Sequence, residues 1–209
     1  MRRKERASYE RSTIHAILDE ALYCHVGFVL AGQPYVIPTV HARIGEHLYL
    51  HGAVASRTLR TAALASPLCV TVTLLDGLVL ARSAFNHSMN YRSVVILATA
   101  SELSDATEKR AALEALVERV VPGRAIEVRA PSSKELKATA VLCVPIAEAS
   151  AKIRTGPPQD DAEDYALGCW AGVVPLQLTP GTPQPDPRLR APAPAPVLGA
   201  RGSGEPSRS

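Results

Sequence analysis

The sequence predicts a mainly β fold with flanking helices, built from about six or seven short, mostly antiparallel strands. Three observations predict it. Segments with the two-residue period of a half-buried strand recur between residues 25 and 147, and turn residues separate them. Stretches of helical periodicity interrupt these segments. Closing or nearly closing the strands into a barrel removes exposed sheet edges, so we expect a barrel with the helices packed outside it.

The first helix is expected over residues 9–23, where apolar side chains recur on one face: Ile14, Ile17, Leu18, Ala21 and Leu22. Turn residues around Gly32 and Gly45 then divide an apolar stretch into three parts. We expect a meander of three strands over residues 25–31, 34–43 and 47–51.

A second helix is expected over residues 56–65, and further strands follow it. Val70, Val72 and Leu74 alternate with threonines, which is the period of a strand with one buried face. Asp76-Gly77 is typical of a hairpin turn. We expect strands over residues 68–75, 78–83, 91–103 and 140–147, with a helix over 106–121 before the last of them.

The composition changes after Thr179. Residues 180–209 hold eight of the seventeen prolines of the chain and almost no large apolar side chains. Such a segment has too little apolar surface to offset the entropy cost of ordering it. The sequence therefore predicts one domain over residues 1–179 and a disordered tail over residues 180–209.

Composition also excludes several classes of protein. The net charge of +3 and the 4% of aromatic residues do not indicate a nucleic-acid surface. No apolar run approaches the roughly 18–20 residues that a membrane span needs, and the basic residues 1–6 do not lead into a secretory signal. The four cysteines are far apart, so they form no close pair typical of a zinc or redox site. We expect a cytoplasmic protein that binds neither nucleic acid nor a membrane.

A phosphate site is expected where the strand that ends at His51-Gly52 leads into the helix that begins at Ser56. The first main-chain N–H groups of a helix have no partner within the helix and attract anions. The hydroxyl of Ser56 and the guanidinium of Arg57 would add donors to phosphate oxygens. The alternative is that Ser56 is an ordinary helix cap and Arg57 a surface residue.

Histidines and a polar segment supply the other candidate residues. His51 could donate a hydrogen bond to a ligand or act as an acid or base. His41, His47 and His51 could converge on a metal or a haem iron, although no carboxylate partner is visible, and we expect no metal site. Arg92 and Ser93 follow a polar segment at the start of a strand and point to opposite faces, so one of them can reach a cleft.

Common catalytic motifs are absent from the sequence. It contains no nucleophile elbow of the hydrolases, no phosphate-binding loop of the nucleotide hydrolases and no dinucleotide-binding glycine motif after a strand. Those enzyme classes are therefore not expected.

Several strings in order resemble the pyridoxamine 5′-phosphate oxidase-like family of FMN-binding split β-barrels, and especially its branch of nitroimidazole-resistance-related flavoproteins. The resemblance covers about residues 8–178. It rests on the Ile-Leu-Asp-Glu-Ala string of the first helix, residues 36–39, residues 49–52 followed by Ser56-Arg57, residues 90–94, residues 150–152, and residues 170–173 with Pro175.

The resemblance implies a homodimer that holds FMN between its two subunits. Ser56 and Arg57 would bind the phosphate, and Arg92 or Ser93 would contact the flavin. The residues that would line the flavin are Ile37, Pro38, Thr39, His51 and Gly52. Lys152 and Trp170 are further candidates that would reach the flavin of the partner. The chain departs from the true vitamin B6 oxidases, because Thr58 replaces a second basic residue and their C-terminal arginine-rich signature is missing.

Two functions follow as hypotheses. The first is an oxidoreductase in which FMN passes electrons from a reduced donor to a small acceptor such as a nitro compound or a quinone. The second is a non-catalytic flavin or haem protein that acts as a carrier or sensor, with His51 and His87 as the residues that favour haem.

Overall fold

The structure is a computed structural model that describes residues 6–53, 67–189, 195, 196 and 198. The chain divides into two compact units. The first comprises residues 1–74 with 91–154, and the second comprises residues 75–90 with 155–209. The long strands β5 (Leu68–Leu80) and β6 (Ser88–Ala98) contribute residues to both units.

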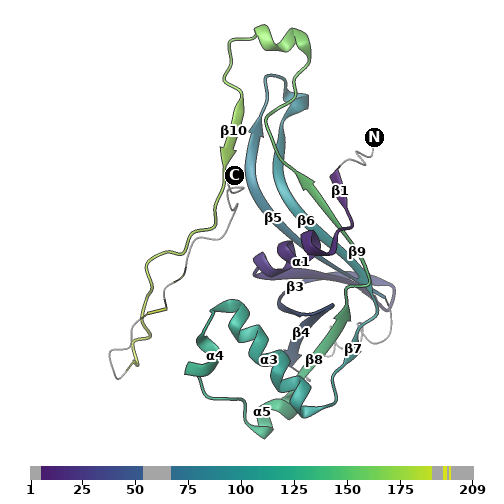
Figure 1. The fold of residues 1–209 in the computed structure, drawn as a ribbon, viewed down its shortest axis with the longest axis vertical. Helices are drawn as coiled ribbons and strands as arrows, with labels where there is room; N and C mark the ends of the chain where they lie inside the picture. The colour runs from purple at the N-terminus through teal and green to yellow at the C-terminus, as the bar shows by residue number, and fades with distance from the viewer. Residues whose placement is uncertain (1–5, 54–66, 190–194, 197, 199–209) are drawn as a thin grey trace. The chain divides into compact units, whose positions relative to one another are not determined.

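The first unit is built on an antiparallel sheet. Its strands pair in the order β1-β9-β6-β5-β2-β3-β4-β8-β7 (Figure 1). Among the described residues, no ladder joins β1 to β7, so the sheet curls without closing. The elements are β1 (Ala7–Ser8), α1 (Arg11–Glu20), β2 (Tyr23–Leu30), β3 (Gln33–Ile44), β4 (His47–Ala53), β5 (Leu68–Leu80), β6 (Ser88–Ala98), β7 (Ser101–Glu102), α3 (Ala106–Val120), α4 (Arg124–Glu127), α5 (Ser133–Ala138), β8 (Thr139–Pro145) and β9 (Glu148–Arg154).

The main core lies on one face of this sheet and includes the apolar side of α1. Alternation along the strands places every second side chain in the core, as Leu48 and Leu50 of β4 show. From α1, the helical period buries Ile14, Ile17 and Leu18. The predicted apolar face of the first helix is therefore confirmed, although the helix is shorter at both ends than residues 9–23.

Three polar contacts hold the C-terminal end of α1. His41 of β3 lies 2.9 Å from the main-chain oxygen of Leu18. Arg92 of β6 forms an ion pair with Glu20, with Nη2 2.7 Å from Oε1. Arg119 of α3 donates from Nη2 to the main-chain oxygen of Ala21 at 2.7 Å. His41 and Arg119 thus satisfy main-chain oxygens at the helix end that would otherwise lack partners, and Arg92 ties the last side chain of the helix to β6.

Helices α3, α4 and α5 form a separate layer of the first unit (Figure 1). α3 contacts β3, β4 and β8 and buries Ala112 and Leu116. Its start is fixed by Asp105, whose carboxylate accepts from the N–H groups of Thr107 and Glu108, both at 2.9 Å. Ser132 and Glu135 form a reciprocal capping box that begins α5.

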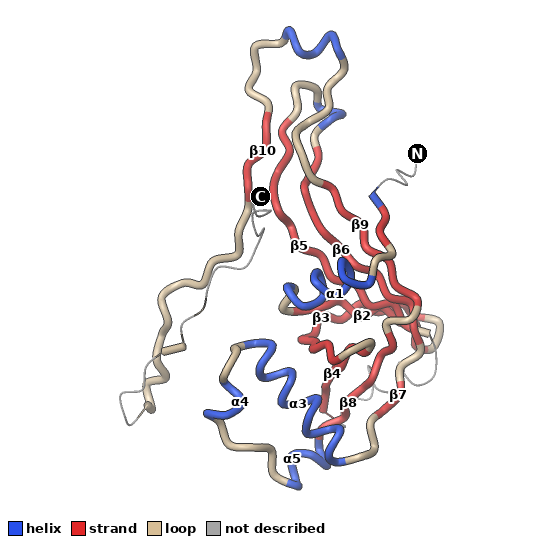
Figure 2. Tube along the Cα trace, viewed as in Figure 1, coloured by secondary structure: helices blue, strands red, loops and turns tan. Residues whose placement is uncertain are grey.

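The second unit contains the distal parts of β5 and β6 and a short strand, β10 (Gly172–Pro175), which pairs with β5 (Figure 2). Two short 3-10 turns, η2 (Ala84–Asn86) and η3 (Ala162–Ala166), lie in its loops. Asp160, whose side chain is fully buried, accepts from the main-chain N–H of Arg82 at 3.0 Å and from its Nη1 at 3.1 Å. This ion pair fixes residues 155–170 to the end of β5.

The structure corrects several sequence predictions. Asp76-Gly77 is not a hairpin turn, because β5 runs unbroken through both residues. Gly77 instead gives β10 room, since a Cβ there would lie 3.0 Å from the main-chain oxygen of Val174. Strands β9 and β10 follow the strand expected over 140–147, so that strand is not the last, and the described residues form ten strands in place of six or seven.

Other predictions are confirmed. Strands β2, β3 and β4 form the predicted meander, and α3 ends one residue short of the predicted 106–121. The predicted helix over 56–65 lies outside the described residues. In the described part of the chain, no helix is both long enough and apolar enough to cross a membrane.

Candidate functional site

A pocket of about 830 Å³ lies between the helical layer of the first unit and the adjoining strands. Its volume is in the range of roughly 300–1,000 Å³ that is typical of ligand and cofactor sites. The apolar wall comes largely from α3 and α4. The lining side chains from these helices and the segment after them are Leu113, Leu116, Val117, Val120, Val121, Ala125, Ile126, Val128, Ala130 and Pro131. The strand side contributes Val40, His51 and Thr139.

His51 is placed in this pocket by the alternation of β4. Leu48 and Leu50 point into the core, so His51 lies on the opposite face, which α3 covers. The backbone pairs His51 with Val141 of β8. The side chain is exposed rather than buried in packing. His51 is therefore an imidazole that a bound molecule can reach.

Charged side chains also line the pocket, and three of them are arginines. Arg124 pairs with Glu127 at 2.7 Å. Arg129 forms a bidentate pair with Glu135 at 2.7 and 2.9 Å. Arg110 is different, because its Nη1 donates to the main-chain oxygen of Pro131 at 3.2 Å, a partner without formal charge.

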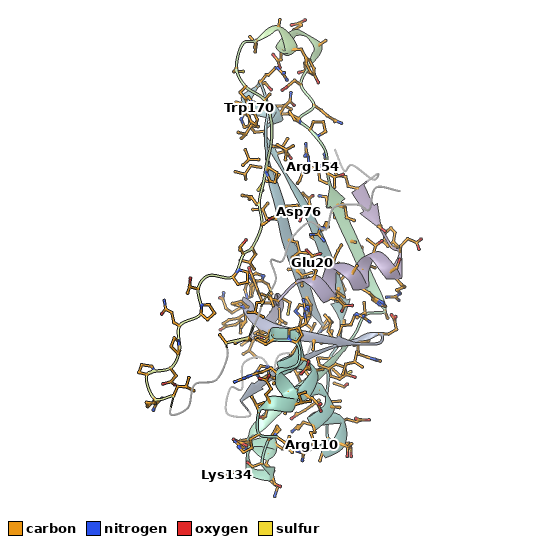
Figure 3. The ribbon with its side chains drawn as sticks, turned by 60° about the vertical axis from the view of Figure 1, so that its left-hand side comes forward. Glu20, Asp76, Arg110, Lys134, Arg154 and Trp170 are labelled. Atoms are coloured by element: carbon orange, nitrogen blue, oxygen red, sulfur yellow. The ribbon has the colours of Figure 1, made fainter. Side chains whose placement is uncertain are left out.

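The pKa of the Glu135 carboxyl is held well below its usual range. Its hydrogen bonds with Arg129 contribute most, and those with Ser132 add to the effect. Glu135 is therefore ionised at neutral pH, where it neutralises the charge of Arg129. Figure 3 labels Arg110 on α3 and Lys134 at the start of α5. Arg124 and Arg129 are thus paired with carboxylates, whereas the partner of Arg110 is a main-chain oxygen.

The predicted flavin-lining residues of β3 lie in the middle of that strand. Ile37, Pro38 and Thr39 pair with residues 24–26 of β2. Ile37 packs against the main core, and Pro38 is exposed. None of the three lines the pocket, whereas the neighbouring Val40 does.

Arg92 and Ser93 point to opposite faces of β6, as predicted. Arg92 shares its face with the buried Val94 and pairs with Glu20. Ser93 lies beside Lys152 of β9, and its Oγ donates to the main-chain oxygen of Lys152 at 3.3 Å. The structure thus brings two of the predicted residues, Ser93 and Lys152, together on one ladder.

The remaining predicted residues have different positions. Gly52 follows His51 on β4 and pairs with Ala140. Ser56 and Arg57 lie outside the described residues. Trp170 belongs to the second unit, where it is 65% exposed and packs against Gly172 (Figure 3).

Convergence of His41, His47 and His51 does not occur. His41 pairs with Leu50 and therefore shares the core face, where it is completely buried, while His47 and His51 lie on the other face of β4. Among the described residues, no group of three or more His, Cys, Asp or Glu side chains is placed to hold a metal ion.

Comparison with known families identifies this architecture. Residues 10–153 match the family model described as pyridoxamine 5′-phosphate oxidase. The chain belongs to the pyridoxamine 5′-phosphate oxidase family. The family expected from the ordered motifs is confirmed, and the open antiparallel barrel of the first unit is the split barrel of this family. Among curated proteins, none matches the chain significantly.

Two solved structures resemble this family member over nearly its whole length. The flavocytochrome Anf3 from Azotobacter vinelandii is 45% identical, with a TM-score of 0.87, and the match covers 93% of this chain and 91% of that protein. A FAD- and haem-binding protein from Mycobacterium smegmatis is 39% identical, with a TM-score of 0.88, and the match covers 95% of this chain and all of that one.

A more distant structure shares the fold of this family member. A protein related to 5-nitroimidazole antibiotic resistance from Bacteroides thetaiotaomicron is 24% identical, with a TM-score of 0.58. That match covers 70% of this chain and 86% of the other.

Sequence reasoning about this family member missed the helical wall of the pocket. Arg110 and the apolar residues of α3 look like an ordinary amphipathic surface helix in the sequence. Neither α4 nor α5 was predicted, because each is shorter than two turns. The signal that was available is the clustering of arginines at 110, 119, 124 and 129 beside an apolar helix.

Proposed function

We propose that this protein binds a flavin and a haem and acts as an oxidoreductase that passes electrons from a reduced donor to a small acceptor. The observation that carries the proposal is the likeness to a flavocytochrome and to a FAD- and haem-binding protein. In both pairs, the match covers at least 91% of this chain and of the other protein. The identities of 45% and 39% over these lengths support a shared function more strongly than a shared fold alone would.

The residues of the pocket fit a haem. Haem is a flat, largely apolar macrocycle with two carboxylates at one edge and an iron that commonly takes an imidazole ligand. The pocket combines an apolar helical wall, an exposed imidazole from His51 and the guanidinium of Arg110. Each of these groups suits one part of a haem: the macrocycle, the iron or the carboxylates.

The flavin is assigned to a different set of residues. The resemblance places its phosphate at Ser56 and Arg57 and its ring near positions 37–39, 51 and 52. In this proposal His51 belongs to the haem, and the flavin keeps the other residues. We propose FAD in place of the FMN expected from the sequence, because the 39% identical relative binds FAD. Both flavins carry the phosphate that Arg57 would bind.

A flavin exchanges two electrons and a haem iron one, so the pair would couple a two-electron donor to one-electron chemistry. The protein supplies the surroundings. The apolar side chains of α3 would exclude water from one face of the pocket, and the low local dielectric strengthens each charged contact made there. A small acceptor, such as a nitro compound or a quinone, would be the substrate.

A homodimer is part of the proposal. The second unit buries Val79 and Ala81 but exposes several large apolar side chains, among them Phe85 at 94% and Trp170 at 65%. These exposed side chains support a surface that another molecule covers. A second copy is the commonest partner of this kind.

The absorption spectrum of the purified full-length chain tests the function. We expect flavin bands together with a haem Soret band, and FAD on mass analysis of the acid-released flavin. Anaerobic addition of NADH or NADPH, followed by a quinone or a nitro compound, should bleach and then restore the flavin band. A protein with both groups that no donor reduces would be a carrier or sensor, and a protein that binds neither group would contradict the proposal.

A further inference from the structure

The strand side of the pocket carries the imidazole of His51, and the helical side carries the guanidinium of Arg110. His51 enters from β4, and Arg110 enters from α3. We propose that this pocket is the haem site, that His51 ligates the iron and that Arg110 binds a haem carboxylate. The inference rests on the proposed function, because it locates one of the two cofactors.

The chemistry of the wall favours haem over flavin in this pocket. An isoalloxazine ring needs hydrogen-bond donors and acceptors along its polar edge, whereas α3 and α4 present Leu113, Val117, Val120 and Ile126. Apolar surface of this kind is the usual surrounding of a porphyrin face. Polar groups are concentrated at a few positions of the lining, which suits a ligand with a few localised polar atoms.

Among the residues that line the pocket, His51 has the side chain best suited to ligate haem iron. Of the other polar lining residues, Arg110, Arg124 and Arg129 are cations, and Glu135 is engaged by Arg129 and Ser132. Glu114 and Thr139 offer only oxygen atoms, which suit haem iron less well than an imidazole nitrogen. An imidazole nitrogen is the commonest protein ligand of haem iron. The two other histidines of this region lie elsewhere, because His41 is buried on the core face and His47 does not line the pocket.

Arg110 is suited to the carboxylate end of the haem. Arg124 and Arg129 already have carboxylate partners, so an added anion would have to displace Glu127 or Glu135. Arg110 would give up only a bond to a main-chain oxygen, or would keep it on one nitrogen while another binds the ligand. This difference predicts that the three arginines contribute unequally to haem binding.

The iron ligand is tested by titrating haem-free, full-length protein with ferric haem. His51→Ala should weaken haem binding by more than about tenfold, since even outer partners of metal ligands contribute roughly 10–100-fold, and should shift the Soret band of any haem that still binds. His47→Ala is the matched control, because His47 lies on the same face of the same strand outside the pocket. It should change neither quantity.

Rescue separates a ligand from a structural residue. His51→Gly should regain the wild-type Soret position when imidazole is added, and circular dichroism should show that the variant is folded. If His51→Ala binds haem with an unchanged spectrum, this inference is wrong while the proposed function stands. If the wild-type chain binds no haem, the haem half of the proposed function fails as well.

The contact between Arg110 and a haem carboxylate is tested with haem dimethyl ester, in which both carboxylates are esterified and uncharged. Arg110→Gln should reduce the affinity for haem by about tenfold to a hundredfold, the usual value of one charged hydrogen bond. The affinity for haem dimethyl ester should stay within about twofold of the wild type. Arg124→Gln is the control and should have a smaller effect on haem. Equal losses for haem and its ester would contradict the role of Arg110.

Discussion

The imidazole of His41 is fully buried between α1 and β3, and its Nε2 lies 2.9 Å from the main-chain oxygen of Leu18. Because a carbonyl only accepts, Nε2 carries the proton and donates it. The other ring nitrogen is buried without a hydrogen-bond partner among the described residues. Burial lowers the pKa of His41, the Leu18 carbonyl raises it in part, and nearby Arg119 lowers it further.

The lowered pKa of His41 predicts how stability depends on pH. The unfolded chain takes up the proton first, near pH 6.5, so this contribution is complete above pH 6.5 and is lost as the pH falls toward the lower folded-state pKa. His41→Gln keeps a donor for Leu18 but cannot take up a proton. Urea unfolding at several pH values between 8 and 5 should therefore show a weaker acid dependence in this variant than in the wild type.

The control for this prediction is His47→Gln, which changes an exposed histidine of the neighbouring strand. It should keep the acid dependence of the wild type. An identical pH dependence in His41→Gln and the wild type would show that His41 does not contribute to acid sensitivity.

Arg57 carries the most direct prediction about the flavin, and it follows from the sequence. Arg57→Ala should weaken binding of FMN or FAD by roughly 1.5–3 kcal/mol, about tenfold to a hundredfold, because one charged hydrogen bond to phosphate is lost. Riboflavin has no phosphate, so its affinity should be unchanged. Fluorescence titration with the three flavins measures this. Equal losses for all three flavins would contradict the phosphate assignment.

The candidate site could be predicted only where it depends on local pattern. The position of His51 at the end of an apolar strand was visible in the sequence. The face to which it points depends on the register of β3 against β4, which pairs His41 with Leu50 and so separates His41 from His51. Register is set by contacts between distant residues, and the role of Arg110 likewise depends on which carboxylates α4 and α5 bring to the other arginines.

At the level of elements, β5 shows how a turn signal can be overridden. Asp76-Gly77 has the composition of a hairpin turn, yet both residues continue the strand. The glycine is needed because the backbone of β10 approaches it closely, and β10 comes from a segment almost a hundred residues later in the chain. Strand β9 was missed for a related reason, since its sequence contains few β-branched residues and its pairing with β6 determines its structure.

Gly77→Ala should loosen β10. The added Cβ would lie 3.0 Å from the main-chain oxygen of Val174 and 3.1 Å from Cγ1 of Val173, so β10 has to shift. Overpacking of this kind costs about 1–3 kcal/mol. Hydrogen exchange of the amides of residues 172–174 should become faster by the factor that corresponds to this loss of stability.

The matched control is Gly168→Ala, because no atom lies within 4 Å of the position of its Cβ. That variant should leave exchange in β10 unchanged or slightly slower, since alanine reduces the freedom of the unfolded chain. Unchanged exchange in Gly77→Ala would show that β10 accommodates the methyl group.

At the level of the whole molecule, the composition of residues 180–209 predicts that this segment is dispensable. A chain that ends at Thr179 should have the thermal midpoint and the flavin and haem content of the full chain, because the deleted residues carry little apolar surface to bury. Calorimetry and absorption spectra of the two proteins measure this. A clear loss in either quantity would mean that the tail packs against the folded part.

The order of strands in the sheet has a consequence for synthesis on the ribosome. By the time residue 120 has been made, β4 and β6 are present, but their partners β8 and β9 begin only at residues 139 and 148. Each of these strands then presents an unpaired edge, which is the form in which nascent chains aggregate. Arg92 and Arg119 must also emerge before the end of α1 has its partners. The ladders of β4 and β6 therefore cannot be completed before Arg154, at the end of β9, has been translated, which is about three quarters of the chain.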